Sequence, residues 1–152
     1  MIRVVLVEPE IPPNTGNIAR LCAATRVPLH IVGVPGFRMD DRAVKRAGLD
    51  YWPEVNLTRH PDLASLHSTL AEARFVYLTK KADTSYVDWT FDINDCLIFG
   101  RETRGLPDDL LRNNWPNCLR IPMANSRVRS LNLATSVAMV LGEALRQTDG
   151  FR

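Results

Sequence analysis

The residues that could carry chemistry in this chain lie in three polar segments, each of which follows a run of apolar residues. Residues 97–99 (LIF) lead into GRETRGLP, and residues 119–123 (LRIPM) lead into ANSRVRS. Near the N-terminus, residues 2–7 (IRVVLV) lead into EPEIPPNTGN. Such apolar runs are typical of buried strands, and a glycine such as Gly100 lets the backbone approach a ligand closely. In α/β proteins, ligands bind where parallel strands end.

Seven polar side chains in these segments could hold a ligand or move a proton: Asn14, Arg20, Glu102, Arg104, Arg129, Ser130 and Asn132. Each also has a structural interpretation. Asn14 and Ser130 suit helix N-caps, Asn132 suits a backbone partner, and the charged side chains suit a solvated surface. Their joint position at three strand ends favours a ligand site at one edge of a sheet.

Common nucleotide and hydrolase motifs do not fit these segments. Gly100 and Gly105 have Walker A spacing, but Leu106 and Pro107 stand where that loop needs lysine and a hydroxyl. No G-x-G-x-x-G follows the first apolar run, and no G-x-S-x-G elbow occurs. The sequence therefore argues against an NTPase, a hydride-transfer enzyme and a serine hydrolase.

The histidines and cysteines indicate neither a metal site nor a disulfide. His30, His60 and His67 lack the spacing of metal ligands. The three cysteines are odd in number and lie among apolar residues. We therefore expect no bound metal, and we expect the cysteines to be buried free thiols.

The positive charges are unevenly distributed, although the formal net charge is only +2. One cluster contains Arg38, Arg42, Lys45 and Arg46, and further arginines flank the two C-terminal polar segments. A solvated surface and a phosphate-binding surface both fit this pattern, and charge alone leaves the two open.

The elements that must position these residues alternate along the chain. Strands are expected at residues 2–7, 29–34, 74–79, 96–100 and 119–123. Helices are expected from Asn14 or Thr15, over 40–49 and 61–73, from Pro107 and from Ser130. This alternation predicts one α/β domain spanning residues 1–152, with a parallel sheet covered by helices on both faces.

Two features of the sequence bear on location. No apolar run approaches the roughly 20 residues of a membrane helix. The N-terminus enters a strand-like run without the layout of a signal peptide. The sequence therefore predicts a cytoplasmic protein that does not enter a membrane.

The segments EPEIPPNTGNIARLCAAT, LIFGRETRGLP and IPM followed by RSLNL resemble the three ordered motifs of the SPOUT superfamily of knotted RNA methyltransferases. The small tRNA (cytidine/uridine-34)-2'-O-methyltransferase family fits best, over residues 2–147. The resemblance implies a SPOUT fold with a deep C-terminal trefoil knot, in which S-adenosylmethionine binds. Periodicity could not have predicted the knot, because knots are rare among protein folds.

The resemblance also implies the site residues. Its cofactor pocket would be formed by Leu78, Thr79, Gly100, Glu102, Ile121, Met123, Ser130 and Leu131. Arg20 matches the family's arginine at the ribose, and Asn14, Ser130 and Asn132 match its catalytic polar partners. Arg129, which directly precedes the matching Ser-Leu-Asn, is expected to bind RNA together with the basic cluster.

The match has two departures from the family pattern. Ala134 and Thr135 replace a more usual Ser-Asn pair, and the segment NSRVRS has two arginines where the family commonly has a single Ser-Arg-Ser.

The leading hypothesis is therefore a metal-independent enzyme that transfers a methyl group from S-adenosylmethionine to the 2'-hydroxyl of the tRNA wobble nucleotide, cytidine 34 or modified uridine 34. Its partner would be the tRNA anticodon stem-loop. The resemblance implies a homodimer formed through residues 17–24 and 134–145. Two alternatives remain: the same chemistry at another tRNA position or on ribosomal RNA, and a non-catalytic RNA-binding module.

Overall fold

Seven parallel strands form one sheet in the order β3-β2-β1-β6-β4-β7-β5. The computed structural model describes the backbone of residues 1–152 and the side chains of residues 1–47 and 51–152. The strands are β1 (Arg3–Val7), β2 (Leu29–Val32), β3 (Leu57–His60), β4 (Arg74–Leu78), β5 (Thr84–Ser85), β6 (Asp95–Phe99) and β7 (Cys118–Arg120). The central strands β1 and β6 are fully or largely buried, as their apolar runs predicted.

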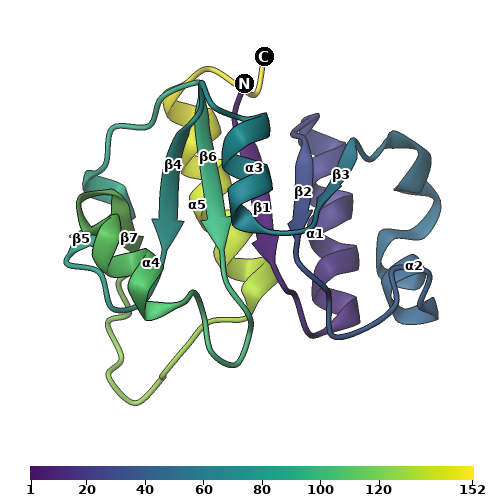
Figure 1. Ribbon diagram of the computed structural model, residues 1–152, viewed down its shortest axis with the longest axis horizontal. Coiled ribbons are helices and arrows are strands. Elements are labelled where there is room, and N and C mark those ends of the chain that lie inside the picture. The colour runs from purple at the N-terminus through teal and green to yellow at the C-terminus, as the bar shows by residue number, and fades with distance from the viewer.

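Helices cover both faces of the sheet (Figure 1), as the sequence predicted. The α-helices are α1 (Pro12–Thr25), α2 (Arg42–Gly48), α3 (Leu63–Thr69), α4 (Asp108–Asn113) and α5 (Leu133–Gln147). Short 3-10 helices are η1 (Leu49–Glu54), η2 (Tyr86–Asp88) and η3 (Trp115–Asn117). Ile18 of α1 and Leu141 of α5 belong to the core on one face. Leu66 of α3 and Leu111 of α4 belong to the core on the other.

Two predicted helix starts are wrong. Helix α1 begins at Pro12 rather than at Asn14 or Thr15, and no side chain caps it. Proline has no N–H and a fixed φ, so two successive prolines suit the first turn. Helix α5 begins at Leu133 rather than near Ser130, and its cap is Asn132, whose Oδ1 accepts a hydrogen bond from the amide of Thr135 at 3.2 Å. The side chains of Asn14 and Ser130 are therefore free for other roles.

Strand β7 is shorter than the predicted run of residues 119–123. Pro122 lacks an N–H and cannot continue a ladder, so the strand ends at Arg120. Ile121 and Met123 consequently lie in the loop that follows. Strand β2 likewise ends at Val32, because Gly33 adopts a left-handed backbone conformation with φ of +78°.

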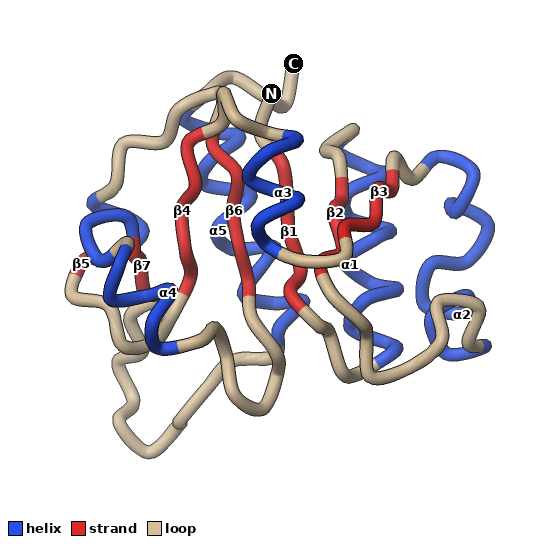
Figure 2. The backbone as a smooth tube through the Cα atoms, viewed as in Figure 1, coloured by secondary structure: helices blue, strands red, loops and turns tan.

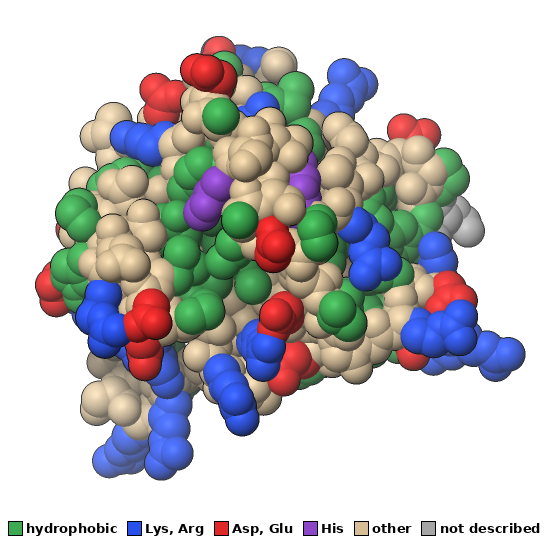
Figure 3. Space-filling model, in the orientation of Figure 1, with side chains coloured by type: hydrophobic (Ala, Val, Ile, Leu, Met, Phe, Trp, Pro, Cys, Tyr) green, Lys and Arg blue, Asp and Glu red, His purple; other side chains and the backbone are tan. Residues whose placement is uncertain are grey.

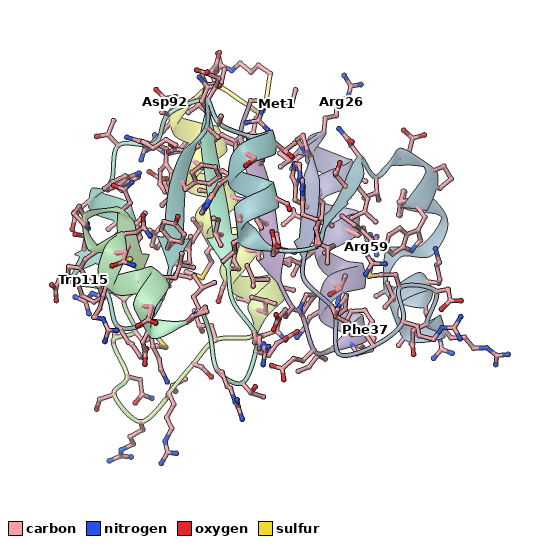
Figure 4. All side chains as sticks on the ribbon, viewed as in Figure 1. Met1, Arg26, Phe37, Arg59, Asp92 and Trp115 are labelled. Atoms are coloured by element: carbon pink, nitrogen blue, oxygen red, sulfur yellow. The ribbon has the colours of Figure 1, made fainter. Side chains whose placement is uncertain are left out.

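The carboxyl ends of all seven strands meet at one edge of the sheet, where the longest loops gather (Figures 1 and 2). Both chain termini lie at the opposite end, and so do the labelled Met1, Arg26 and Asp92 (Figure 4). No helix in the described part of the chain has the length and apolarity needed to cross a membrane. The polar segments singled out in the sequence therefore share one edge of the sheet.

Candidate functional site

A cavity of about 370 Å³ lies at the carboxyl ends of β4, β6 and β7. Every residue predicted to bind the cofactor lines it. Leu78, Thr79, Gly100 and Glu102 contribute from the ends of β4 and β6. Ile121, Met123, Ser130 and Leu131 contribute from the long loop between β7 and α5. Residues that lie up to 53 positions apart in sequence are thus brought to one concave surface of the size that small-molecule sites usually have.

The walls of this cavity combine apolar side chains with free backbone groups. Leu78, Ile121 and Leu131 are half-buried, so each offers apolar surface to the cavity. Neither Met123 nor Leu131 forms a main-chain hydrogen bond with another described residue. Their N–H and C=O groups are available to a ligand, as recognition of a purine ring by backbone requires.

A tight hairpin closes one side of the cavity. Arg101 and Gly105 form an isolated antiparallel bridge, and Gly105 has φ of +67°, which glycine adopts without strain. A Cβ on Gly100 would lie less than 3.0 Å from the carbonyl carbon of Gly105 and the amide nitrogen of Leu106. Gly100 is therefore needed because the hairpin backbone packs against it, a reason that the sequence did not reveal.

Two carboxylates tie this hairpin to the segment between β1 and α1. The Glu102 carboxylate accepts hydrogen bonds from the backbone amides of Glu10 (2.8 Å) and Ile11 (3.1 Å). The Glu10 carboxylate accepts in return from the amide (3.0 Å) and Oγ1 (2.7 Å) of Thr103. The hydrogen bonds from Thr103 lower the pKa of Glu10. Glu102 thus lines the cavity while its carboxylate fixes the loop at the start of α1.

Asn14 joins this network to the last helix. Its Nδ2 lies 3.5 Å from Oε1 of Glu102, and its Oδ1 accepts a hydrogen bond from Nδ2 of Asn132 at 2.9 Å. Asn14 is 6% exposed, so both ends of its amide are held beside the cavity. Three of the predicted polar residues therefore form one network across all three polar segments.

Two predicted arginines lie outside the cavity. Arg20 is exposed on α1, with its guanidinium 5.2 Å from the ring centroid of Tyr51. Arg129 is exposed in the loop before α5, as is Arg127, and neither lines the cavity. A single chain therefore brings the eight residues predicted to bind the cofactor to one cavity, which Arg20, Asn14 and Asn132 do not line.

The basic cluster lies beyond the end of β2, mostly on α2. Arg38 pairs with Asp40 at 3.1 Å, and the Lys45 ammonium lies 4.5 Å from the centroid of the Trp52 ring. Arg42 and Arg46 are exposed.

Lys and Arg side chains also gather along the lower edge of the molecule in Figure 3, near the loops that surround the cavity. The cluster is thus on the surface, at some distance along the same edge.

The cysteines are buried free thiols, as expected. Burial raises the pKa values of Cys22 and Cys96 to about 12, so neither is a thiolate at neutral pH. Among the described residues, no group of three or more His, Cys, Asp or Glu side chains could hold a metal ion.

Three residues of the site were missed by sequence reasoning. Glu10 and Thr103 lie within two of the motif segments but were not singled out, since their interaction spans 93 positions. Ser136 lines the cavity from the first turn of α5. It lies four residues after Asn132, and its Oγ donates to the Asn132 carbonyl at 3.2 Å. That four-residue spacing was the available signal, because such residues share a helix face.

Comparisons with known proteins agree with this geometry. The model of the SpoU rRNA methylase family matches residues 1–142. A Bacillus subtilis protein provisionally named tRNA (cytidine(34)-2'-O)-methyltransferase is 48% identical over 149 residues, which cover 96% of this chain and 92% of the relative. A solved structure described as giving insight into 2-OH methylation of C/U34 on tRNA superposes with a TM-score of 0.91 at 42% identity, covering 97% of this chain and 95% of that one.

A third protein bears on the cavity. The AdoMet-bound rRNA methyltransferase of Sinorhizobium meliloti superposes with a TM-score of 0.85 at 26% identity, over 95% of this chain and 56% of that chain. AdoMet is S-adenosylmethionine, so the shared fold binds this molecule in at least one solved relative.

Proposed function

The chain belongs to the SpoU rRNA methylase family, and from that premise we propose that it methylates the ribose 2'-hydroxyl of the tRNA wobble nucleotide, cytidine 34 or uridine 34. The observation that carries this proposal is the cavity formed by two of the polar segments, to which Glu102, one of its lining residues, connects Asn14 and Asn132 through a continuous network. Residues 1–152 then constitute one SPOUT methyltransferase domain, which acts in the cytoplasm.

The cavity fits S-adenosylmethionine. Leu78, Ile121 and Leu131 supply apolar walls for the adenine ring, and the free backbone groups of Met123 and Leu131 can bind its polar edge. Thr79 and Ser130 add hydroxyl groups for the ribose or the amino acid part. Gly100 keeps the hairpin wall in place.

The chemistry requires alignment more than acid–base power. Bound S-adenosylmethionine supplies a methyl group made electrophilic by the positive sulfonium. Asn14 and Asn132, which are hydrogen-bonded to each other, would orient the ribose so that the 2'-oxygen faces this methyl carbon. Arg20 would donate a hydrogen bond to the developing alkoxide while the hydroxyl proton leaves to solvent, because a guanidinium is a poor base but a good oriented donor.

Threading of the C-terminal segment into a trefoil knot is part of the proposal. In the sheet order, β6 and β4 separate β1 from β7. After β7 the chain returns past both strand ends to Asn132, which is bonded to Asn14 of α1. The C-terminal segment therefore passes the loops that leave β4 and β6. A knot requires that it thread through such a loop.

A homodimer explains how Arg20 reaches a ribose. Helices α1 and α5 cover the same face of the sheet, and their outer surface includes the exposed Asn17, Ala138 and Met139. Pairing two chains through this face would place Arg20 of one protomer beside the other protomer. We propose that the Arg20 side chain serves the cavity of the partner subunit.

Mixed dimers test that arrangement. Arg20→Ala removes the donor, and Ile121→Arg blocks the cavity with a long charged side chain. If Arg20 acts across the dimer, remixing the two inactive variants in equal amounts should restore about a quarter of the wild-type rate, since half of the dimers are mixed and each has one complete site. If Arg20 acts within its own chain, the mixture stays inactive. Sedimentation of the wild type as a 17.1 kDa monomer would contradict the dimer itself.

The function is tested by transferring a labelled methyl group to total tRNA and ribosomal RNA, followed by nucleotide mapping. Label confined to the 2'-oxygen of nucleotide 34 is the expected result. Label at another position or in ribosomal RNA would support the same chemistry on a different RNA. Titration calorimetry that detects no S-adenosylmethionine binding up to millimolar concentration would instead support the non-catalytic module.

A further inference from the structure

A second cavity, of about 480 Å³, lies on the other side of the hairpin from the cofactor cavity. It is formed where β1 and β2 end, by the start of α3 and by the segment that follows the hairpin. Lys81, Arg101, Arg104, Gly105 and Leu106 line both cavities, so the hairpin is their common wall. A molecule in the second cavity would therefore lie one hairpin's width from the reacting centre.

The second cavity is lined by apolar and charged side chains in equal number, and three of the charged ones, Glu8, Asp62 and Asp108, are carboxylates. Val7 and Val32 are buried at the strand ends, and Leu63 is half-buried at the start of α3. Pro61 and Pro107 add flat, rigid ring surfaces. Apolar walls of this kind accept the face of a planar heterocycle, and the volume is within the about 300–1,000 Å³ usual for small-molecule sites.

Four of the six charged side chains around this cavity form ion pairs, whereas Asp62, which caps α3 by accepting from the Ser65 amide, and Arg104 do not. Arg101 pairs with Glu8, and the Lys81 ammonium lies 2.7 Å from Oδ1 of Asp108. Arg104 is exposed and forms no side-chain hydrogen bond or ion pair within the described residues, and its charge contributes to the lowered pKa of Glu10. An exposed arginine in the hairpin between two cavities suits a phosphate group that links a nucleotide in one cavity to a nucleotide in the other.

We propose that the second cavity is a nucleobase site for the RNA nucleotide adjacent to the methylated one, with Arg104 binding the phosphate that joins them. The proposal rests on the RNA methyltransferase function above. In an ordinary RNA loop, stacking between bases would keep the target ribose from the site. Moving the neighbouring base into the second cavity would separate the two nucleotides and expose the target ribose at the hairpin. The site would thereby contribute both affinity and alignment.

The probe is an anticodon stem-loop in which single nucleotides around the methylated position are replaced, one at a time, by abasic residues. Affinity for the wild-type protein should fall about tenfold for one of the two immediate neighbours, because loss of a buried base removes its contacts. It should change little at the other positions. A profile in which neither immediate neighbour matters would overturn the proposal.

A cavity-filling variant localises the effect. Leu63→Trp fills the second cavity from a position that does not line the first, and Ala64→Trp places the same side chain on the exposed neighbouring position as a control. Leu63→Trp should weaken binding of the intact stem-loop and abolish the abasic penalty, while S-adenosylmethionine affinity is unchanged. Ala64→Trp should keep the penalty. If a folded Leu63→Trp protein still loses the same affinity for the abasic stem-loop, the proposed nucleobase site is wrong.

The proposed function and this inference can fail separately. Methyl mapping on the wild-type product decides which nucleotide is modified, and the abasic profile is then interpreted relative to that nucleotide. Should Leu63→Trp fail to fold, the abasic profile of the wild-type protein decides by itself. Arg104→Ala provides a further readout, because loss of one phosphate contact should flatten the slope of log affinity against log salt by roughly 0.7 to 0.9.

Discussion

Asn14 and Asn132, which are 118 positions apart in the sequence, are joined by a hydrogen bond of 2.9 Å from Nδ2 of Asn132 to Oδ1 of Asn14. The same Asn132 caps helix α5 through its Oδ1. One side chain thus fixes where the last helix begins and holds the first helix beside it. Since Asn14 also lies against Glu102, the pair sets the distance between the three polar segments.

Two substitutions at Asn132 separate these roles. Asn132→Ser keeps a capping oxygen but is too short to reach Asn14, and should cost about 1 kcal/mol of unfolding free energy for the lost hydrogen bond. Asn132→Ala also removes the cap and should cost about 2 kcal/mol in total. Urea unfolding of both variants is the measurement. Equal losses would mean that the cap contributes nothing measurable.

Gly100→Ala should weaken S-adenosylmethionine binding severely, because the added Cβ forces the Gly105–Leu106 backbone away and opens the hairpin. The buried sheet should still unfold cooperatively. Gly142→Ala is the matched control, since a Cβ there meets no atom within 4 Å and alanine favours a helix interior. Calorimetry of cofactor binding distinguishes them. Normal affinity in Gly100→Ala would show that the cavity does not depend on the hairpin.

Arg20→Ala should lower the single-turnover rate at saturating tRNA and cofactor by roughly a hundredfold, the usual effect of losing one oriented donor to a developing oxyanion. Arg20→Lys keeps the charge without the planar fork and should recover part of the rate. S-adenosylmethionine affinity should not change, because the proposed contact of Arg20 is with the ribose of the RNA, and Arg20 does not line the cavity of its own chain. A wild-type rate for Arg20→Ala would remove this residue from the chemistry.

Protein stability should fall as the pH is lowered from about 6.5 to about 4. His30 is buried and shares a hydrogen bond of 2.8 Å with His60, and burial, His60 and Arg3 lower its pKa to about 4. Between those pH values the unfolded chain binds a proton that the folded chain does not, so unfolding is favoured by about 2–3 kcal/mol at the acid end. Urea unfolding from pH 7 to pH 4 measures this. His30→Gln cannot titrate and should flatten the dependence of the unfolding free energy on pH. An equally steep curve for this variant would mean that other groups cause the dependence.

Arg46→Ala should flatten the slope of log tRNA affinity against log salt by roughly 0.7 to 0.9 if this exposed side chain contacts a phosphate. Arg42→Ala should act alike. Arg38 and Lys45 already interact with Asp40 and Trp52, so their replacement should change the slope less. Cofactor affinity serves as the internal control. Unaltered slopes in all four variants would make this cluster a solvated surface.

The sequence by itself determined the fold class and predicted eight of the residues that line the cavity. Buried apolar runs specified the parallel strands, since period and burial are local properties of β1 and β6. All eight residues that the motif resemblance implied for the cofactor pocket, from Leu78 to Leu131, line the cavity, because family motifs mark positions near a ligand. The beginnings of α1 and α5 were misplaced because Asn14 and Ser130 also match capping preferences.

Only the tertiary structure decided what each site residue contacts. Glu102 looked like a cofactor ligand in sequence, yet its carboxylate binds the backbone amides of Glu10 and Ile11. Gly100 looked like a point of ligand approach, yet it makes room for the hairpin. Arg20 belongs to the same motif as Asn14 but lies outside the cavity of its own chain. These are long-range relationships fixed by packing and by the pairing of buried polar groups, which no local pattern of residue types encodes.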